Sequence, residues 1–122
     1  MPGDSITRMG EIPTAFLERH LTTFNEAVAT GDFGPLVELF APDARLAFAG
    51  LPIGPFDGRA AIAAAYEAQP PTDTMTILER EADEDGTIVQ QFSWSADDGE
   101  RSGEMRLRVT DEQIEQLVVS FD

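Results

Sequence analysis

The chain has 122 residues, no cysteine and one histidine, and its 23 acidic and 8 basic residues give a formal net charge of −15. This length predicts one domain with a real core. The missing cysteines exclude disulfides and a cysteine nucleophile, and the lone His20 excludes a multi-histidine metal site, so we expect no metal and no cofactor. The acidic balance argues against nucleic acid and against an anionic membrane surface as partners.

The first residues show no sign of targeting. Residues 1–10 contain no apolar segment of the kind found in a signal peptide, and we expect them to form a flexible leader to a single domain over 11–122. No apolar run reaches the roughly 20 residues of a membrane span. These features predict a soluble, cytoplasmic protein.

Two helices are expected in the first third of the domain. Apolar residues recur at helical spacing from Ile12 to Val28, and Gly31 stands where a helix would end on a left-handed residue. Asp32 is then placed to cap a second helix that has a proline in its first turn and runs to Pro42. The segment 44–48 follows as a strand.

A loop rich in glycine and proline leads from this strand to a third helix. We expect the helix over about 59–68, with Asp57 as its cap, and the two prolines after Gln69 prevent its continuation. Ile62 and Tyr66 are four residues apart, so their side chains share one face of the helix.

The rest of the chain reads as four strands joined by tight turns: TMTILEREA, TIVQQFSWSA, RSGEMRLRVT and IEQLVVSFD. Strands in this arrangement form an antiparallel meander, so the sequence predicts an α+β domain with its helices on one face of the sheet.

Alternation along these strands predicts one largely apolar inner face, because hairpin turns fix the register. Its members are Met75, Ile77, Ile88, Phe92, Trp94, Met105, Leu107, Val109, Leu117, Val119 and Phe121. In this register Glu79 and Gln90 are direct neighbours in the middle of that face, while Arg80 lies on the opposite face. A slip of one residue would turn Glu79 outward.

The segments TGDFGPLVELFAPDA and GRAAIAAAY, followed by a meander ending in IEQLVVSFD, resemble the SnoaL-like proteins. These proteins belong to the nuclear transport factor two-like superfamily, which includes ketosteroid isomerases. The resemblance covers about residues 12–122. It implies a cone-shaped, cystatin-like α+β barrel, in which a curved antiparallel sheet wraps around a long N-terminal helix and encloses an apolar pocket. It also implies a homodimer formed through sheet surfaces.

The catalytic pattern of the isomerases is mostly missing. By the resemblance, their general base falls on Phe48 or Ala49, their oxyanion-holding tyrosine on Phe24, and their protonated aspartate near Met105 or Arg106. Only the supporting tyrosine matches, as Tyr66. Ketosteroid isomerisation by the usual residues is therefore not expected.

The candidate catalytic residues are Glu79 and Tyr66. A carboxylate on an apolar wall has a raised pKa and suits acid–base work, and Gln90 beside it would orient it or bind a ligand carbonyl. Tyr66 would donate to a ligand oxygen. The alternatives are a Glu79 carboxylate that reaches solvent at the sheet edge and a Tyr66 that only packs in the core.

The candidate ligand-binding residues are mostly large and apolar: Gln90, Trp94, Phe92, Phe24, Phe48, His20 and Met105. His20 is the only side chain whose ordinary pKa suits proton transfer near neutral pH, although a lone helical histidine more often packs or sits at a rim.

Two functions follow. The first is a cofactor-free isomerase, cyclase or hydrolase that acts on a small apolar compound through Glu79. The second is a non-catalytic module that binds a hydrophobic small molecule or forms a homodimer.

Overall fold

The computed structural model describes residues 12–122, so the predicted leader over 1–10 lies outside the described residues. The elements follow in the order α1 (Thr14–Thr30), α2 (Gly34–Val37), β1 (Phe40–Phe48), β2 (Phe56–Asp57), α3 (Arg59–Ala68), β3 (Met75–Ala82), β4 (Ile88–Trp94), a 3-10 turn η2 (Ser95–Asp97), β5 (Gly103–Thr110) and β6 (Gln113–Phe121). This is the α+β class that the sequence predicts.

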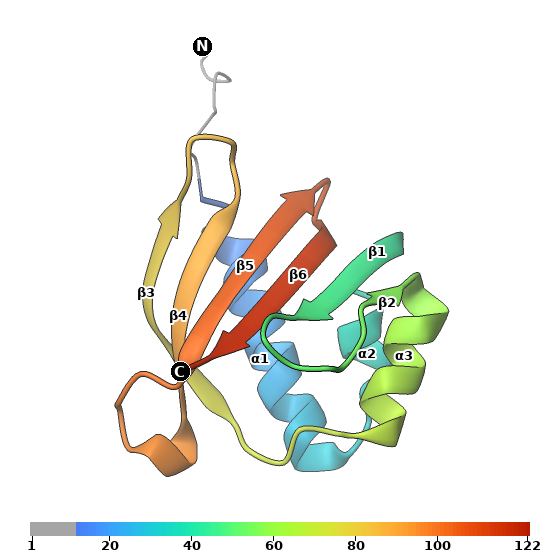
Figure 1. The fold of residues 1–122 in the computed structure, drawn as a ribbon, viewed down its shortest axis with the longest axis horizontal. Coiled ribbons are helices and arrows are strands. Elements are labelled where there is room, and N and C mark those ends of the chain that lie inside the picture. The colour runs from blue at the N-terminus through green and yellow to red at the C-terminus, as the bar shows by residue number, and fades with distance from the viewer. Residues whose placement is uncertain (1–11) are drawn as a thin grey trace.

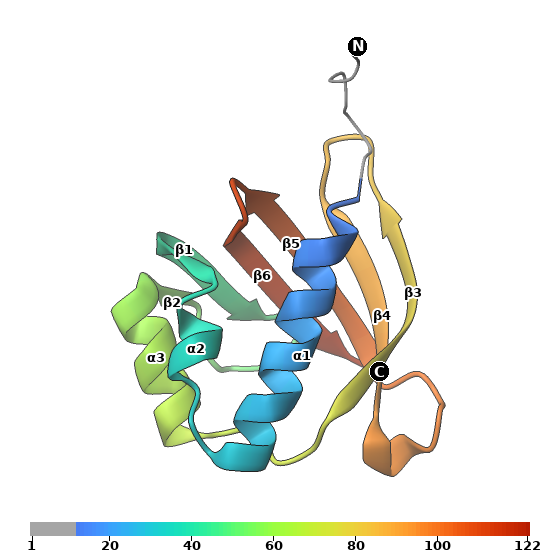
Figure 2. The same ribbon diagram turned by 180° about the vertical axis from the view of Figure 1, so that it is seen from behind.

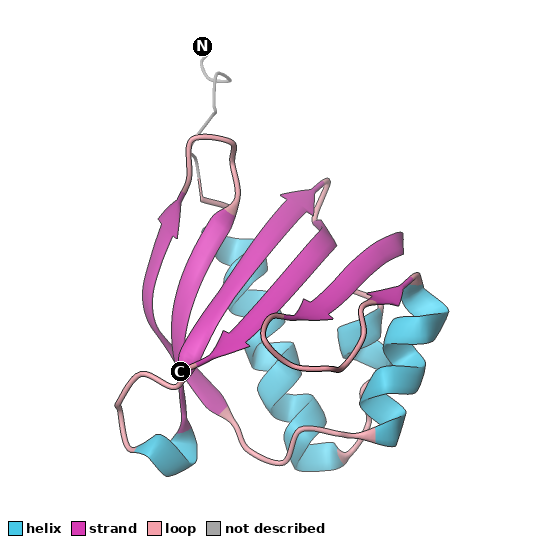
Figure 3. Cartoon of the chain, in the orientation of Figure 1, coloured by secondary structure: helices cyan, strands magenta, loops and turns pink. Residues whose placement is uncertain are grey.

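The strands form a six-stranded sheet in the order β2-β1-β6-β5-β4-β3 (Figure 1). The predicted meander from β3 to β6 is confirmed, because each neighbouring pair in it is antiparallel. β1 adds to its free edge parallel to β6. The helices lie on one side of the sheet, and α1 crosses its inner face (Figures 2 and 3).

The long helix α1 ends where the sequence indicates. Gly31 has a φ of +82°, and its N–H donates to the carbonyl oxygen of Ala27 at 2.7 Å. A residue with a Cβ disfavours this backbone conformation, which explains the glycine at the helix end. The buried face of α1 carries Phe16, Leu17, His20, Phe24 and Ala27.

The second helix is shorter than predicted. A carboxylate oxygen of Asp32 accepts a hydrogen bond from the N–H of Gly34 at 3.0 Å, but α2 ends at Val37 and does not reach Pro42. The reason is tertiary: β1 begins at Phe40, because this stretch pairs with β6. The pairing of β1 with β6 therefore overrides the local sequence preference for a longer helix.

The third helix has its predicted bounds but not its predicted cap. Gly58 precedes α3 with a φ of +93°, and no side chain caps the helix. The prediction for Asp57 is wrong because this residue belongs to β2, where its carboxylate pairs with Nε of Arg45 at 2.9 Å. Ile62 and Tyr66 are the buried residues of α3, as their spacing predicts.

A β-bulge breaks the predicted register between β3 and β4. Met75 pairs with Trp94 and Ile77 with Phe92, as predicted, but the register shifts between Ile77 and Glu79. Beyond the bulge each β3 residue is therefore displaced by one position, and the side chains exchange faces.

The register between β4 and β5 differs by two residues from the prediction. Phe92 pairs with Gly103 and Gln90 with Met105, because η2 and the turn after it lengthen the connection. A register shift of two residues leaves every side chain of β4 and β5 on its predicted face of the sheet. The predicted inner face thus survives, and the pairing of Met105 with Val119 on β6 is confirmed.

The space between α1 and the sheet holds a continuous apolar core. Leu17, Leu36, Phe40, Leu46, Ile62, Phe92, Leu107 and Ile114 are among its fully buried members. An apolar pocket inside the cone stays a prediction.

Candidate functional site

The structure places Glu79 on the outer side of the sheet. Its side chain is exposed, and it pairs with Gln91, whereas the sequence predicts a pairing with Gln90 on the inner face. The bulge in β3 causes the difference. The inward position predicted for Glu79 is therefore wrong, and its carboxylate does not lie on the apolar inner face.

Arg80 takes the position that was predicted for Glu79. It pairs with Gln90, and its Nε donates to Oε1 of Gln90 at 2.7 Å. Its Nη2 contacts a carboxylate oxygen of Glu18 on α1 at 3.1 Å. Gln90 is 1% exposed, so this arginine supplies the hydrogen bond that a buried amide oxygen needs. The inner face therefore carries a cation where the sequence predicts a carboxylate.

His20 is buried in the middle of α1. It is 2% exposed, and its Nε2 has no hydrogen-bond partner within residues 12–122. Burial lowers the pKa of His20 from 6.5 to about 4, so the ring is neutral at pH 7. A neutral ring in the core fits the packing role better than proton transfer near neutral pH.

Predicted ligand-binding residues meet in one aromatic cluster, formed by Phe24, Phe48, Phe92, Trp94 and Phe121. Phe24 lies 6.2 Å from Trp94 between ring centroids, and Phe92 contacts Trp94 edge to face at 5.2 Å. Phe121 meets Phe92 edge to face at 6.2 Å and stacks with Phe48 at 6.4 Å. Three strands, β1, β4 and β6, and α1 thus contribute to one apolar surface, and such ring geometries stabilise the cluster beyond the buried area.

Gly103 makes this cluster possible. It pairs with Phe92 on one side and with Phe121 on the other, so the two rings meet over a residue without a side chain. A Cβ at this position would lie 3.0 Å from the ring of Phe92 and would overlap the carbonyl oxygen of Ser120. Glycine is therefore required by close approach at this position.

The backbone around the cluster is tied down by Ser102. Its Oγ accepts a hydrogen bond from the N–H of Trp94 at 2.8 Å and donates one to a carboxylate oxygen of Asp97. The N–H of Asp122 donates to the Ser102 carbonyl at 3.0 Å. The ends of β4 and β6, which carry Trp94 and Phe121, are thereby fixed to the same residue.

The aromatic cluster is buried on one side and open on the other. Phe92 and Phe24 are buried, Phe48 and Trp94 are half-buried, and Phe121 is 43% exposed. Met105 is buried next to Gln90 on the inner face and is not part of the exposed surface. The half-exposed rings therefore form an aromatic rim at the end of β1, β4 and β6.

Tyr66 lies far from Glu79, so the predicted catalytic pair does not form. α3 and β3 stand at opposite sides of the molecule in both ribbon views (Figures 1 and 2). The Tyr66 ring stacks instead on Phe33, with centroids 5.4 Å apart. Burial raises the pKa of its hydroxyl.

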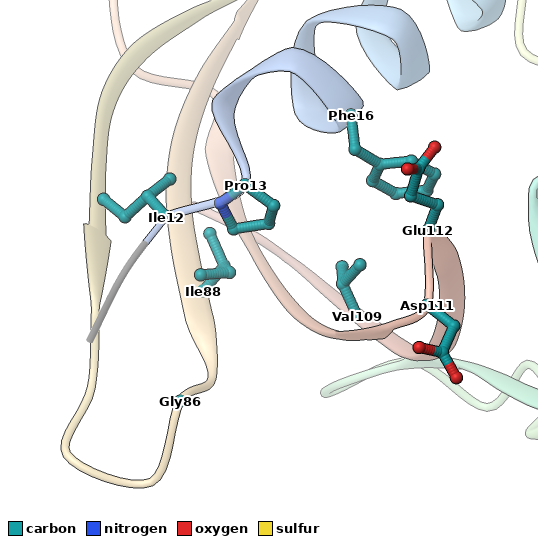
Figure 4. A pocket seen from close by; sticks show the side chains of 8 residues that line it. All are labelled: Ile12, Pro13, Phe16, Gly86, Ile88, Val109, Asp111 and Glu112. Carbon is teal, nitrogen blue, oxygen red and sulfur yellow. The ribbon is translucent and has the colours of Figure 1, made fainter. Parts of the chain in front are cut away.

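A cavity of about 300 Å³ opens at the other end of β6 from the aromatic rim, beside the start of α1 (Figure 4). Its walls are Ile12, Pro13, Phe16, Gly86, Ile88, Val109, Asp111 and Glu112. None of the predicted site residues lines it. Its carboxylates belong to the turn between β5 and β6, where Asp111 and Glu112 have φ values of 52° and 59°.

Sequence reasoning missed Arg80 as a residue of the inner face and Phe121 as a member of the aromatic cluster. Arg80 was assigned to the outer face, since a bulge leaves no clear signal in an alternating strand. Phe121 was placed on the inner face but not in the site. The signal for Phe121 was its position at the end of β6. In the sheet, β6 lies between β1, which ends at Phe48, and β5, which begins at Gly103.

Two general features complete the description of residues 12–122. Among them, no group of three or more histidine, aspartate or glutamate side chains is arranged to hold a metal ion. None of the helices in this part of the chain has the length and apolar character needed to cross a membrane.

The fold is shared with several solved structures. A steroid delta-isomerase from Pseudomonas aeruginosa aligns with a TM-score of 0.61 and 19% identity over 92% of this chain and 84% of its own. An NTF-2-like protein of unknown function from Burkholderia xenovorans gives a TM-score of 0.63 at 16% identity, covering 92% and 87%. A protein with a cystatin-like fold from Methylobium petroleophilum gives 0.64 at 17%, covering 93% and 79%.

At these identities the structural neighbours establish the fold alone. No curated protein matches the sequence. The model of the SnoaL-like domain matches residues 21–114. This match spans most of the chain, so the protein belongs to the SnoaL-like domain family of the nuclear transport factor two-like superfamily.

Proposed function

We propose that the protein binds a flat, apolar small molecule at the aromatic rim, where the rings of Phe48, Trp94 and Phe121 are partly open. The observation that carries the proposal is the exposure of Phe121, which is 43% open to solvent although its ring contacts two other aromatic rings. Exposure of apolar surface to water is unfavourable, and a flat ligand that covered these rings would remove apolar area from water.

The chemistry of the aromatic rim favours binding over acid–base catalysis. Its members carry no group that titrates near neutral pH, and the positions of the isomerase base fall on Phe48 or Ala49. Glu79, the predicted proton carrier, is exposed on the outer side of the sheet. Of the two functions that the sequence suggests, non-catalytic binding therefore has the better physical support.

Alanine substitution at two equally exposed apolar residues tests this proposal. Phe121 and Leu78 are 43% and 40% exposed, but only Phe121 belongs to the aromatic rim. We expect titration calorimetry with indanone, a flat bicyclic ketone, to give saturable binding. Phe121→Ala should weaken it by about two- to tenfold, the equivalent of an aromatic contact of about 0.5–1.5 kcal/mol. Leu78→Ala should leave it unchanged. Equal effects of the two variants, or no binding by the unaltered protein, would reject the proposal.

A further inference from the structure

A second cavity, of about 530 Å³, lies on the helical side of the molecule between the end of α1, α2 and α3. It is lined by Gly31, Asp32, Phe33, Gly34, Val37, Glu38, Ala63, Tyr66, Glu67 and Pro70. Its volume is within the range of small-molecule sites. The aromatic rim contributes no residue to it, so it is a separate place on the molecule.

Tyr66 is the one buried polar residue among those that line this cavity. Tyr66 is only 9% exposed and lines the cavity, and no hydrogen-bond partner for its hydroxyl occurs within residues 12–122. A hydroxyl on a buried ring is free to accept a hydrogen bond from a ligand group inside the cavity. The stacked ring of Phe33 adds an apolar wall beside it.

The electrostatics of the cavity favour a positive charge. Its lining includes the carboxylates of Asp32, Glu38 and Glu67 but no basic side chain. Two helices also end there: α1 finishes one residue before Gly31, and α3 ends one residue after Glu67. The C-terminal end of a helix carries a partial negative charge, and neither helix has a basic residue in its last turn to offset it.

The neighbouring positive groups do not cancel this field. The N-terminal N–H of α2 at Gly34 already donates to Asp32. Arg59, the first residue of α3, donates from its guanidinium to the carbonyl oxygen of Phe40 at 2.5 Å and 3.1 Å. Both are therefore engaged within the protein and are not directed at a ligand.

We propose that this cavity binds a small organic ammonium ion with an aromatic or alkyl body. The ammonium N–H groups would donate to the Tyr66 oxygen and to the rim carboxylates, while the body would contact Phe33 and Val37. This ligand class is fixed by the negative rim, the apolar walls and the unpartnered hydroxyl taken together.

The sole tyrosine of the chain provides a direct readout. Incorporation of fluorotyrosine places one fluorine label in the protein, at Tyr66. Titration with phenethylammonium should shift its fluorine NMR signal in a saturable way. The neutral analogue phenethyl alcohol should bind more weakly, and the anion hydrocinnamate should cause no shift. Added salt should weaken the binding of the ammonium ion, because the rim carboxylates are exposed.

A matched pair of charge-removing variants separates a specific site from general attraction to an acidic protein. Glu67→Gln should raise the Kd for phenethylammonium about two- to fivefold, the effect of an exposed ion pair, whereas Glu115→Gln on the exposed side of β6 should not. The proposal is overturned if hydrocinnamate shifts the signal as phenethylammonium does, if neither shifts it at millimolar concentration, or if the two variants behave alike. Binding at the aromatic rim is tested with substitutions at Phe121 and Leu78, so the result here is independent of the function proposed above.

Discussion

Arg80 donates from Nε to the buried Oε1 of Gln90 at 2.7 Å, across the β3–β4 pair just beyond the bulge. This contact defines the inner face more sharply than any apolar residue does, since it shows which of two adjacent charged residues points inward. Glu79, its neighbour in sequence, is exposed on the other side.

Removal of this donor should destabilise the fold. In Arg80→Met the buried oxygen of Gln90 loses its partner, and the free energy of unfolding should fall by about 1–3 kcal/mol. Glu79→Met should change it by less than about 0.5 kcal/mol, because that side chain is exposed. Urea denaturation of both variants measures this. A larger loss for Glu79→Met than for Arg80→Met would contradict the observed register.

The stability of the protein should depend on His20 between about pH 4 and 6.5. The unfolded chain protonates this ring below its ordinary pKa of 6.5, but burial lowers the pKa to about 4 in the fold. The unfolded state therefore binds more protons across this window, so stability rises with pH there, by about 3 kcal/mol in all.

A His20→Leu variant isolates this contribution from that of the carboxylates. The difference in unfolding free energy between the variant and the unaltered protein should shift in favour of the variant as the pH falls from 7 to 4. Urea denaturation at several pH values provides the measurement. Parallel pH profiles of the two proteins would show that His20 titrates alike in the folded and unfolded states.

Gly103 should not tolerate alanine. The added methyl group would overlap the Ser120 carbonyl and press on the Phe92 ring, so we expect a loss of about 1–3 kcal/mol in thermal or urea unfolding. Gly34→Ala is the matched control, because the only atom near its added Cβ is a carboxylate oxygen of Asp32, at 3.2 Å. Similar losses for both substitutions would argue against close approach of rings over Gly103.

The homodimer expected from the family resemblance stays a prediction, and the outer face of the sheet is where we place it. On this face Arg106 pairs with Asp83 at 2.7 Å and with Glu104 at 3.2 Å. Sedimentation velocity should show a dimer that Arg106→Glu converts to monomer, since the substitution leaves only negative charge at this place on the contact face of each copy. A monomer in the unaltered protein, or a dimer that persists in the variant, would contradict this interface.

The sequence was sufficient for the elements whose signals are local. The end of α1 at Gly31 and the bounds of α3 follow from helix periodicity and from glycine and proline chemistry. The inner face of β4 to β6 was also predictable, because the error in register was an even number of residues. The early end of α2 was not, since the pairing of Phe40 with a strand more than seventy residues away decides it.

The candidate site was predictable only in its apolar part. Phe24, Phe48, Phe92 and Trp94 were all expected to bind ligand, and they do meet in one aromatic cluster. The polar part failed because one extra residue in β3 exchanges Glu79 for Arg80, and a bulge of this kind depends on the whole sheet. The buried face of Tyr66 was predictable from helix periodicity, but its partner Phe33, on which that face packs, was not.

The central claim, that the aromatic rim binds an apolar ligand, is tested most directly at Trp94. This is the sole tryptophan, so fluorotryptophan gives one fluorine NMR signal, from within the aromatic cluster. On titration with indanone we predict a saturable shift of this signal and no shift of the fluorotyrosine signal from Tyr66. An unchanged Trp94 signal, or equal shifts at both residues, would contradict the account.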